Sequence, residues 1–239
     1  MALSIAQTIA LHNLLREGMK VASFGYPDMI APPSLMDRLV GTKTGLKYRT
    51  DSDAICRRHG MERRPIPDAE HLFALLGCTL HVYDIVQERG CEILCDLNDP
   101  MVVIHDYDIV LDVGTVEHCF NIGQAMMNMA GMVKVGGYIV HENPFNCGNH
   151  GFYNLNPTFY KDFYTANGFT VLSCLLSTRD GRVCDVPHAS RFSFLEQEIN
   201  TYALARRDSV VPFTFPMQAK YAKAAAGPSG ERAASARAI

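Results

Sequence analysis

The sequence predicts an α/β fold: a doubly wound, mostly parallel sheet of seven strands with helices on both faces, in three layers. Short apolar runs recur along the chain and alternate with amphipathic stretches of helical period. Most of these runs end in a glycine or an acidic residue, as strands do where they enter a turn. Hydrophobic residues make up 48% of the 239 residues, which is enough to cover both faces of such a sheet.

The first half of the chain opens with a helix and a strand. Apolar residues at helical spacing predict a helix from Ile5 to Leu15, and the run 20–25 (KVASFG) predicts a buried strand that ends in a glycine turn. A proline pair followed by serine marks the start of a helix at 34–40. Three further elements are bounded by polar residues: a helix at 68–76 and strands at 79–83 and 91–95.

The second half contains the most apolar strand, 107–113 (YDIVLDV), and then a helix at 121–130 whose methionines belong to the core. Gly136 and Gly137 predict a turn into a strand at 138–141. Proline and glycine also mark the boundaries of a helix at 157–167, which is followed by a strand at 169–176. The last predicted element is an antiparallel hairpin of 191–196 and 199–206.

We expect one domain over residues 1–223, with an insertion or lid at 41–67 and a disordered tail at 224–239. The segment 41–67 has no period of two or 3.6, and irregular segments of this length are uncommon unless functional or disordered. Its arginines form either a solvated face or an anion-binding wall for a carboxylate or phosphate-bearing substrate. They are Arg57, Arg58, Arg63 and Arg64.

Charge and cysteine usage exclude several classes of partner. The formal net charge of -3 provides no basic field that would attract nucleic acid, and no apolar stretch is long enough for an export signal or a membrane span. Eight scattered cysteines predict reduced thiols and a cytoplasmic location. Cys91 and Cys95 lack a second pair, so we expect no metal site there.

Polar residues follow several of the predicted strands at the point where each strand ends. In doubly wound sheets ligands bind beyond the carboxyl ends of the strands, near the switch in strand order. Gly25, Asp84, Asp96 and the turn 112–118 are therefore expected to converge on one site.

Two strings in the second half resemble a known enzyme family. Residues 108–118 (DIVLDVGTVEH) are an apolar strand that ends in a short turn and a Glu-His pair, and residues 132–140 (MVKVGGYIV) follow after one helix. Together with His150, Tyr153 and 167–169 (NGF), they resemble class I S-adenosylmethionine-dependent methyltransferases that act on small molecules. The resemblance implies a Rossmann-like methyltransferase fold and S-adenosylmethionine as cofactor.

The resemblance also implies which residues bind the donor. Asp84, with Ile85, takes the position that pairs the ribose hydroxyls, and 96–98 take the adenine position, with Asp96, Leu97 and Asn98. Gly114 and His118 follow the fourth strand of the family. The alternative is that Asp84 and Asp96 are only helix caps or turn residues.

The first turn departs from the family pattern. Its usual acidic residue and several glycines are replaced by Gly25, Tyr26, Pro27 and Asp28. Asp28 is expected to supply the carboxylate for the amino group of the donor. A single glycine after a strand is a weak signal.

Methyl transfer to a hydroxyl or amine requires a base, and histidine is the natural one near neutral pH. We expect His150 to act as base, with His118 and Glu117 as further catalytic residues. Asn149 and Tyr153 are expected to orient the acceptor and Phe145 to form an apolar wall. Alternatively, His118 caps its helix and His150 only holds its loop.

A metal site made of His141, Glu142 and His150 is disfavoured, because adjacent residues of a strand point to opposite faces. We expect no metal.

The predicted function is methylation of an oxygen or nitrogen of a small metabolite, such as a sugar or natural-product intermediate. One alternative is a catalytically silent relative that serves as a partner subunit. A nicotinamide-dependent oxidoreductase is disfavoured, because the first turn lacks G-x-G-x-x-G and the chain lacks a suitable Tyr-x3-Lys pair. The expected partner is a small-molecule substrate, and a homodimer is one option for assembly.

Overall fold

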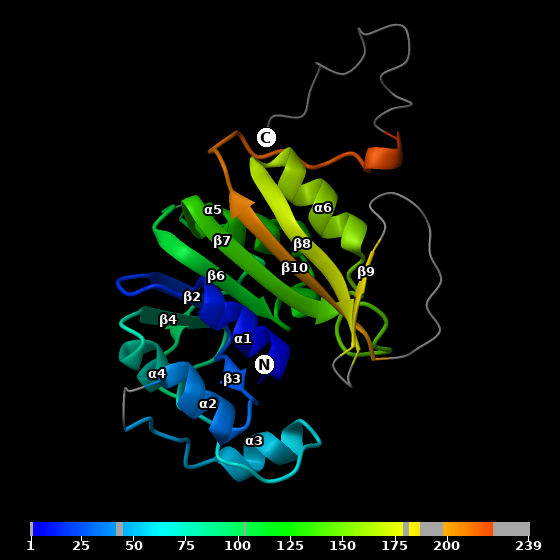
Figure 1. Cartoon of the computed structure of the whole chain (residues 1–239). Helices are drawn as coiled ribbons and strands as arrows, with labels where there is room; N and C mark the ends of the chain where they lie inside the picture. The colour runs from blue at the N-terminus through cyan, green and yellow to red at the C-terminus, as the bar shows by residue number, and fades with distance from the viewer. Residues whose placement is uncertain (1, 42–44, 103, 179–181, 187–197, 222–239) are drawn as a thin grey trace, which may run out of the picture.

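A central sheet of eight strands organises the part of the chain that the structure describes (Figure 1). The computed structural model describes residues 2–41, 45–102, 104–178, 182–186 and 198–221. The strand order is β5-β4-β2-β6-β7-β10-β8-β9. These strands are β2 (Lys20–Phe24), β4 (Thr79–Asp84), β5 (Ile93–Leu94), β6 (Tyr107–Val113), β7 (Val133–Pro144), β8 (Phe169–Ser177), β9 (Val183–Asp185) and β10 (Asn200–Arg207).

The sheet is mixed, and it has one strand more than the seven predicted. The first five strands of that order run parallel, whereas β10 runs antiparallel to both of its neighbours and β9 runs antiparallel to β8. β10 matches the predicted strand 199–206, but it lies between β7 and β8. The other half of the predicted hairpin, 191–196, lies outside the described residues.

Helices cover both faces of the sheet. One face carries α1 (Ile5–Leu14), α2 (Pro33–Val40) and α4 (Ala69–Leu75), whose buried residues Leu11, Met36 and Phe73 pack with Ile109 and Leu111 of β6. The other face carries α5 (Ile122–Met132) and α6 (Pro157–Ala166). β6 can contribute to both cores because alternate residues of a strand point to opposite faces.

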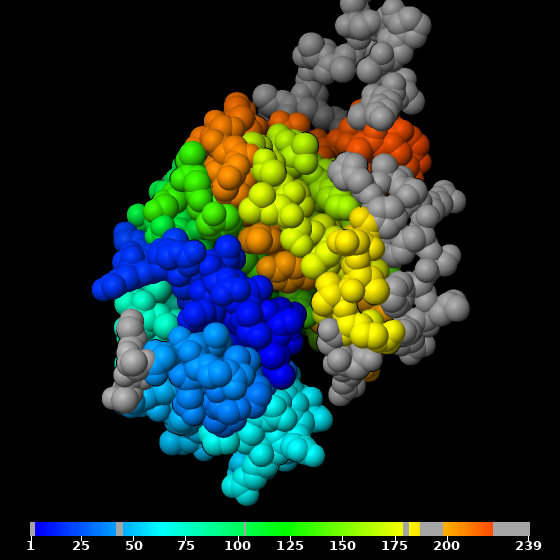
Figure 2. Space-filling view, viewed as in Figure 1, coloured from blue at the N-terminus to red at the C-terminus, as the bar shows by residue number. Residues whose placement is uncertain are grey.

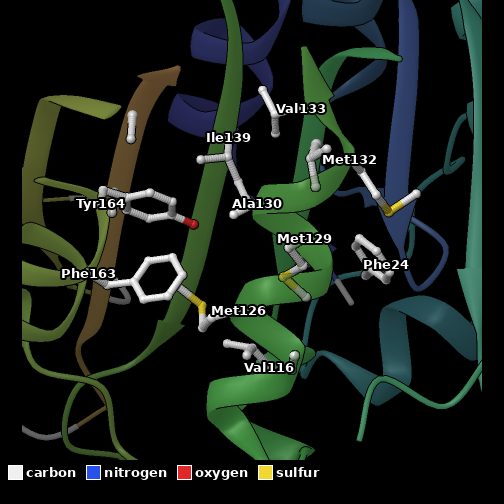
Figure 3. Close-up of a cluster of buried hydrophobic side chains, with 14 of the residues drawn as sticks. Phe24, Val116, Met126, Met129, Ala130, Met132, Val133, Ile139, Phe163 and Tyr164 are labelled. Carbon is white, nitrogen blue, oxygen red and sulfur yellow. The ribbon is translucent and has the colours of Figure 1, made fainter. Parts of the chain in front are cut away.

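The core beneath α5 and α6 is built from methionine and aromatic side chains, as predicted for the methionines. Met126 of α5 reaches toward Phe163 of α6, and Met129 lies between Met126 and Phe24 of β2; Tyr164 of α6 belongs to the same core (Figure 3). All five side chains are at most 4% exposed. Flexible methionines fill the irregular space between rings and sheet.

The glycine pair at 136–137 was predicted as a turn, but it lies inside β7. Gly136 has a φ of 83°, and the pairing of β6 with β7 shifts register next to this pair. A Cβ on Gly137 would lie 2.9 Å from the carbonyl oxygen of Asp108. The pair is therefore a bulge at which two backbones approach closely.

The segment 41–67 contains a helix that the sequence pattern did not predict. α3 (Ser52–Arg58) buries Ile55 and Cys56 against Ile66, and an isolated antiparallel bridge joins Tyr48 to Pro67. Two buried apolar residues are too few to give a helical period. Two short elements complete the described fold: β1 (Ala2–Leu3) pairs in parallel with β3 (Asp28–Met29).

Among the helices in the described ranges, none combines the length and the apolar character needed to cross a bilayer.

Candidate active site

A cavity of about 350 Å³ opens at the edge where the parallel strands end. It lies at the switch in strand order, because the chain builds outward from β2 to β4 and β5 and then returns to β6 on the other side. The residues that the sequence predicts at the donor site come together here. Nine of the ten residues expected to bind the donor line this cavity: Gly25, Tyr26, Asp84, Ile85, Asp96, Leu97, Asn98, Gly114 and His118.

The two acidic residues of the cavity hold their turns as well as line the wall. Asp84 Oδ1 accepts a hydrogen bond from the backbone N–H of Val86 at 3.3 Å. Asp96 Oδ1 accepts from both the backbone N–H and the side-chain amide of Asn98, each at 2.8 Å. A carboxylate has further lone pairs, so each aspartate can also accept from a ligand.

Asp28 is the expected donor residue that does not line this cavity. It is fully buried and lies 3.3 Å from the guanidinium of Arg89, which in turn stacks 4.2 Å from the centre of the Tyr26 ring. Burial raises the pKa of Asp28, and the positive charge of Arg89 opposes that rise. Asp28 therefore fixes Arg89 at the cavity wall instead of pointing into the cavity.

Two arginines complete the cavity wall, and the donor assignment from the sequence missed both. Arg58 comes from the end of α3 and Arg89 from the turn after β4. For Arg58, the sequence pattern that could have found it was the arginine cluster of 41–67, one interpretation of which was an anion-binding wall. Arg63 of the same cluster is exposed and pairs with Asp53 instead. No sequence pattern pointed to Arg89.

Glu117, His118 and His150 meet beside this cavity. A short 3₁₀ turn, η1 (Val116–His118), follows β6, and the Asp112 carboxylate caps it by accepting from the N–H groups of Thr115 and Val116. The Glu117 side chain is fully buried. Its Oε1 lies 3.5 Å from Nε2 of His150 and 3.8 Å from Nε2 of His118.

The two histidines differ from Glu117 in exposure. Their side chains are about half exposed, and their ring centres are 5.2 Å apart. Burial raises the pKa of Glu117 to about 8, and the nearby charge of Asp112 adds to the rise. Burial lowers the pKa of His118, with a further contribution from His150.

A buried polar network holds Glu117 in place. The amide of Asn143 donates to Glu117 Oε2 at 2.9 Å and to Asp112 Oδ2 at 3.0 Å. Asp112 Oδ2 also accepts from Nδ1 of His141 at 2.6 Å, and the other ring nitrogen of His141 bonds the hydroxyl of Tyr164. His141 is thus a fully buried structural residue.

The loop expected to bind the acceptor folds over η1. The backbone N–H of Phe152 donates to the carbonyl of Glu117 at 2.9 Å, and the hydroxyl of Tyr153 donates to the carbonyl of Phe120 at 2.8 Å. Asn149 is exposed with a φ of 58°, and Phe145 bonds the backbone of Ile199. Of the four expected acceptor residues, only His150 is placed with the Glu117 cluster; none lines the 350 Å³ cavity.

A second cavity of about 470 Å³ lies under the N-terminus of α1. Figure 2 shows it as a hollow between the blue of α1, the cyan around α3 and the yellow of β9. Glu142 lines it from β7 and His59 from the end of α3, and each has one buried polar atom without a hydrogen-bond partner. Glu142 and His141 face opposite sides of the sheet, as their adjacency predicted. No sequence pattern pointed to this cavity.

No protein-family model and no curated sequence matches this chain. Solved structures resemble it at low identity. TehB from Haemophilus influenzae is 13% identical with a TM-score of 0.49, over 84% of this chain and 62% of that one. This chain thus spans less than two thirds of the length of that structure.

Two further solved structures cover most of both chains. N-methyltransferase NodS from Bradyrhizobium japonicum, in complex with S-adenosylhomocysteine, is 12% identical with a TM-score of 0.47, over 86% of this chain and 89% of that one. The 1,6-didemethyltoxoflavin-N1-methyltransferase of Burkholderia thailandensis, also with S-adenosylhomocysteine, is 12% identical with a TM-score of 0.47, over 84% and 76%.

Proposed function

We propose that this chain is a class I S-adenosylmethionine-dependent methyltransferase that methylates an oxygen or nitrogen of a small metabolite, such as a sugar or natural-product intermediate. The observation that supports it most is the cavity at the switch in strand order, which gathers nine residues expected from the sequence to bind the donor. Those residues come from four separate stretches of the chain. Each stretch lies at or just after the end of a strand, so their convergence is the one expected for a doubly wound sheet.

The cavity offers chemical partners for the ribose, the adenine and the carboxylate of the donor. Asp84 is assigned to the ribose hydroxyls, and Asp96 with Leu97 to the adenine. The Asp96 carboxylate would accept a hydrogen bond from the adenine amine, and the Leu97 side chain would pack on the adenine ring. Arg58 and Arg89 provide positive charge for the carboxylate of the methionine moiety. This replaces the earlier assignment of Asp28 to that end of the donor.

Methyl transfer from a sulfonium is an in-line displacement, so the protein has to position donor and acceptor and then remove one proton from the acceptor. His118 lines the donor cavity and contacts the ring of His150. We therefore assign removal of the acceptor's proton to the cluster of Glu117, His118 and His150, with His150 as the base predicted from the sequence. Phe145, Asn149 and Tyr153 keep their predicted roles toward the acceptor, and a homodimer stays a prediction.

Calorimetric titration with S-adenosylhomocysteine tests the donor assignment. We expect one site per chain, and Asp84→Asn should weaken binding by roughly 10-fold or more because hydrogen bonds to a charged group are lost. Asp185→Asn, on the exposed face of β9, is the matched control and should bind as the wild type does. Absence of binding at millimolar ligand would contradict the proposal.

Two further measurements separate the alternatives. A silent partner subunit would bind no donor and would co-purify with a second protein. An oxidoreductase would instead quench or enhance the fluorescence of a reduced nicotinamide cofactor.

A further inference from the structure

We propose that Glu117, His118 and His150 form a divalent-cation site at the border of the donor cavity, and that the cation binds the methyl acceptor. The cation-binding part stands on the geometry of the three side chains alone. The role toward the acceptor rests on the proposed methyltransferase function.

The distances fit coordination by three protein ligands. One ligand atom from each residue lies within 4.8 Å of the other two. With bonds of about 2.1 Å and tetrahedral angles, two ligand atoms stand about 3.4 Å apart. Glu117 Oε1 lies 3.5 Å from Nε2 of His150 and 3.8 Å from Nε2 of His118, so a cation can enter with only small side-chain adjustments.

Glu117 presents an oxygen that lacks a hydrogen-bond donor. Its side chain is fully buried, and within the described residues Oε1 has no hydrogen-bond partner. Leaving a buried carboxylate oxygen in this state is costly. A cation between Oε1 and the two imidazoles would satisfy that oxygen and favour the ionised carboxylate.

The other oxygen of Glu117 is held as a metal ligand usually is. Oε2 accepts from the side-chain amide nitrogen of Asn143, which also donates to Asp112, and the hydroxyl of Tyr160 donates to the side-chain oxygen Oδ1 of Asn143. Such outer partners fix the direction of a ligating carboxylate. The network therefore aims Oε1 at the histidines and adds the negative charge of Asp112 behind it.

The site leaves room for a fourth ligand. The side chains of His118 and His150 are 50% and 52% exposed, so the coordination positions away from Glu117 face outward. Two histidines and one carboxylate with an open position suit first-row divalent cations such as Mn²⁺, Co²⁺ and Zn²⁺. His118 also lines the donor cavity, which places this open side beside the donor.

A cation here would change how the acceptor loses its proton. An acceptor hydroxyl bound to the cation has a lower pKa and gives its proton to water or buffer. The oxygen then attacks the methyl carbon, the carbon–sulfur bond breaks with its electrons passing to sulfur, and S-adenosylhomocysteine leaves. His150 then acts as a ligand, and the proton leaves from the bound hydroxyl.

Titration of chelator-treated protein with Mn²⁺, followed by electron paramagnetic resonance, tests the site. We expect one saturable site per chain, and a Co²⁺ visible spectrum with imidazole ligation. Glu117→Gln and His150→Ala should each weaken Mn²⁺ binding by at least about 10-fold, the loss typical of disturbed metal sites. His59→Ala, at the second cavity, should leave it unchanged. His150 is exposed, so its variant reports on binding even if the Glu117 variant fails to fold.

Two results would overturn the cation site: no saturable binding of Mn²⁺ or Co²⁺ at millimolar concentration, or binding that His150→Ala leaves unchanged. Titration of the wild type with S-adenosylhomocysteine keeps the two proposals apart. Donor binding without Mn²⁺ binding removes the cation site alone. Mn²⁺ binding without donor binding removes the methyltransferase function and leaves the cation site standing.

Discussion

Glu117 and Glu142 face opposite sides of the sheet, and burial raises the pKa of each. Glu142 points away from Glu117 into the second cavity, where Asn200 donates to its Oε1 and its Oε2 lacks a partner. Burial raises its pKa to about 7, and the hydrogen bond from Asn200 opposes that rise. A charge placed there costs stability because little in the cavity solvates it.

Glu142→Gln tests this cost through the pH dependence of unfolding. The folded pKa lies above the ordinary value of 4.5, so the folded chain binds the proton more tightly. Its stabilising contribution is complete below about pH 4.5 and is lost as pH rises through 7, which amounts to about 3 kcal/mol at pH 8. Relative to wild type, the variant should therefore gain stability between pH 5 and pH 8 in urea unfolding. Glu62→Gln, at an exposed position, is the control; a gap that is equal at both pH values would contradict the assignment.

Tyr164→Phe tests the network beneath Glu117. The substitution removes the hydroxyl that bonds His141 and leaves a fully buried ring nitrogen without a partner. Stranding such a group costs about 1–3 kcal/mol, so the free energy of unfolding in urea should fall by that amount. Tyr138→Phe, at a half-buried position on β7, should change it by less than about 0.5 kcal/mol. Equal effects of the two variants would show that the hydrogen bond to His141 does not stabilise the fold.

Asp84, Asp96 and Gly114 could be placed from the sequence because each stands at or just after the end of a strand. Arg89 and the true role of Asp28 could not, because their pairing joins positions 61 residues apart. The meeting of His150 with Glu117 depends on a loop whose path no periodicity encodes.

At the scale of elements, Gly168 lies between the end of α6 and the start of β8. Gly168 follows α6 with a φ of 80°, and a Cβ on it would lie 2.6 Å from the carbonyl oxygen of Ser209. Its own carbonyl accepts from the N–H groups of Asp208 and Ser209. The residue thus joins α6 and β8 to the segment after β10.

Gly168→Ala should lower the free energy of unfolding by at least about 1–3 kcal/mol, the cost of a strained φ, with the backbone clash in addition. Gly148→Ala is the matched control, because its added Cβ meets nothing within 4 Å and its φ is not positive. Thermal unfolding of both variants measures the difference. A Gly168 variant as stable as its control would mean that this junction relaxes freely.

The elements that could be predicted are those with a long, regular pattern. The bounds of β6 match the prediction, because a mostly apolar run lies between Asp106 and the turn glycine Gly114. α3 was missed because seven residues with two buried side chains carry no period. The turn predicted at Gly136 failed because glycines also mark bulges, and only the pairing partner distinguishes the two.

For the whole molecule, composition and alternation predicted a layered sheet but not its strand order. Whether β10 lies at an edge or between β7 and β8 depends on pairings between distant segments, which local patterns do not specify. The candidate site depends on that strand order, because it lies where β2 and β6 pair and the strand order reverses.

Donor binding should therefore stabilise the molecule unevenly. The cavity joins residues after β2, β4, β5 and β6 with Arg58 from α3, so S-adenosylhomocysteine would hold these segments together. At a ligand concentration of 100 times its Kd, the free energy of unfolding should rise by about 2.7 kcal/mol. Hydrogen exchange followed by mass spectrometry should show slower exchange at 24–26, 84–89, 95–98 and 114–119. The strand β9, remote from the cavity along the sheet, should exchange more slowly only to the extent that global unfolding is suppressed. Protection centred on β9, or none at the four segments, would place the donor elsewhere.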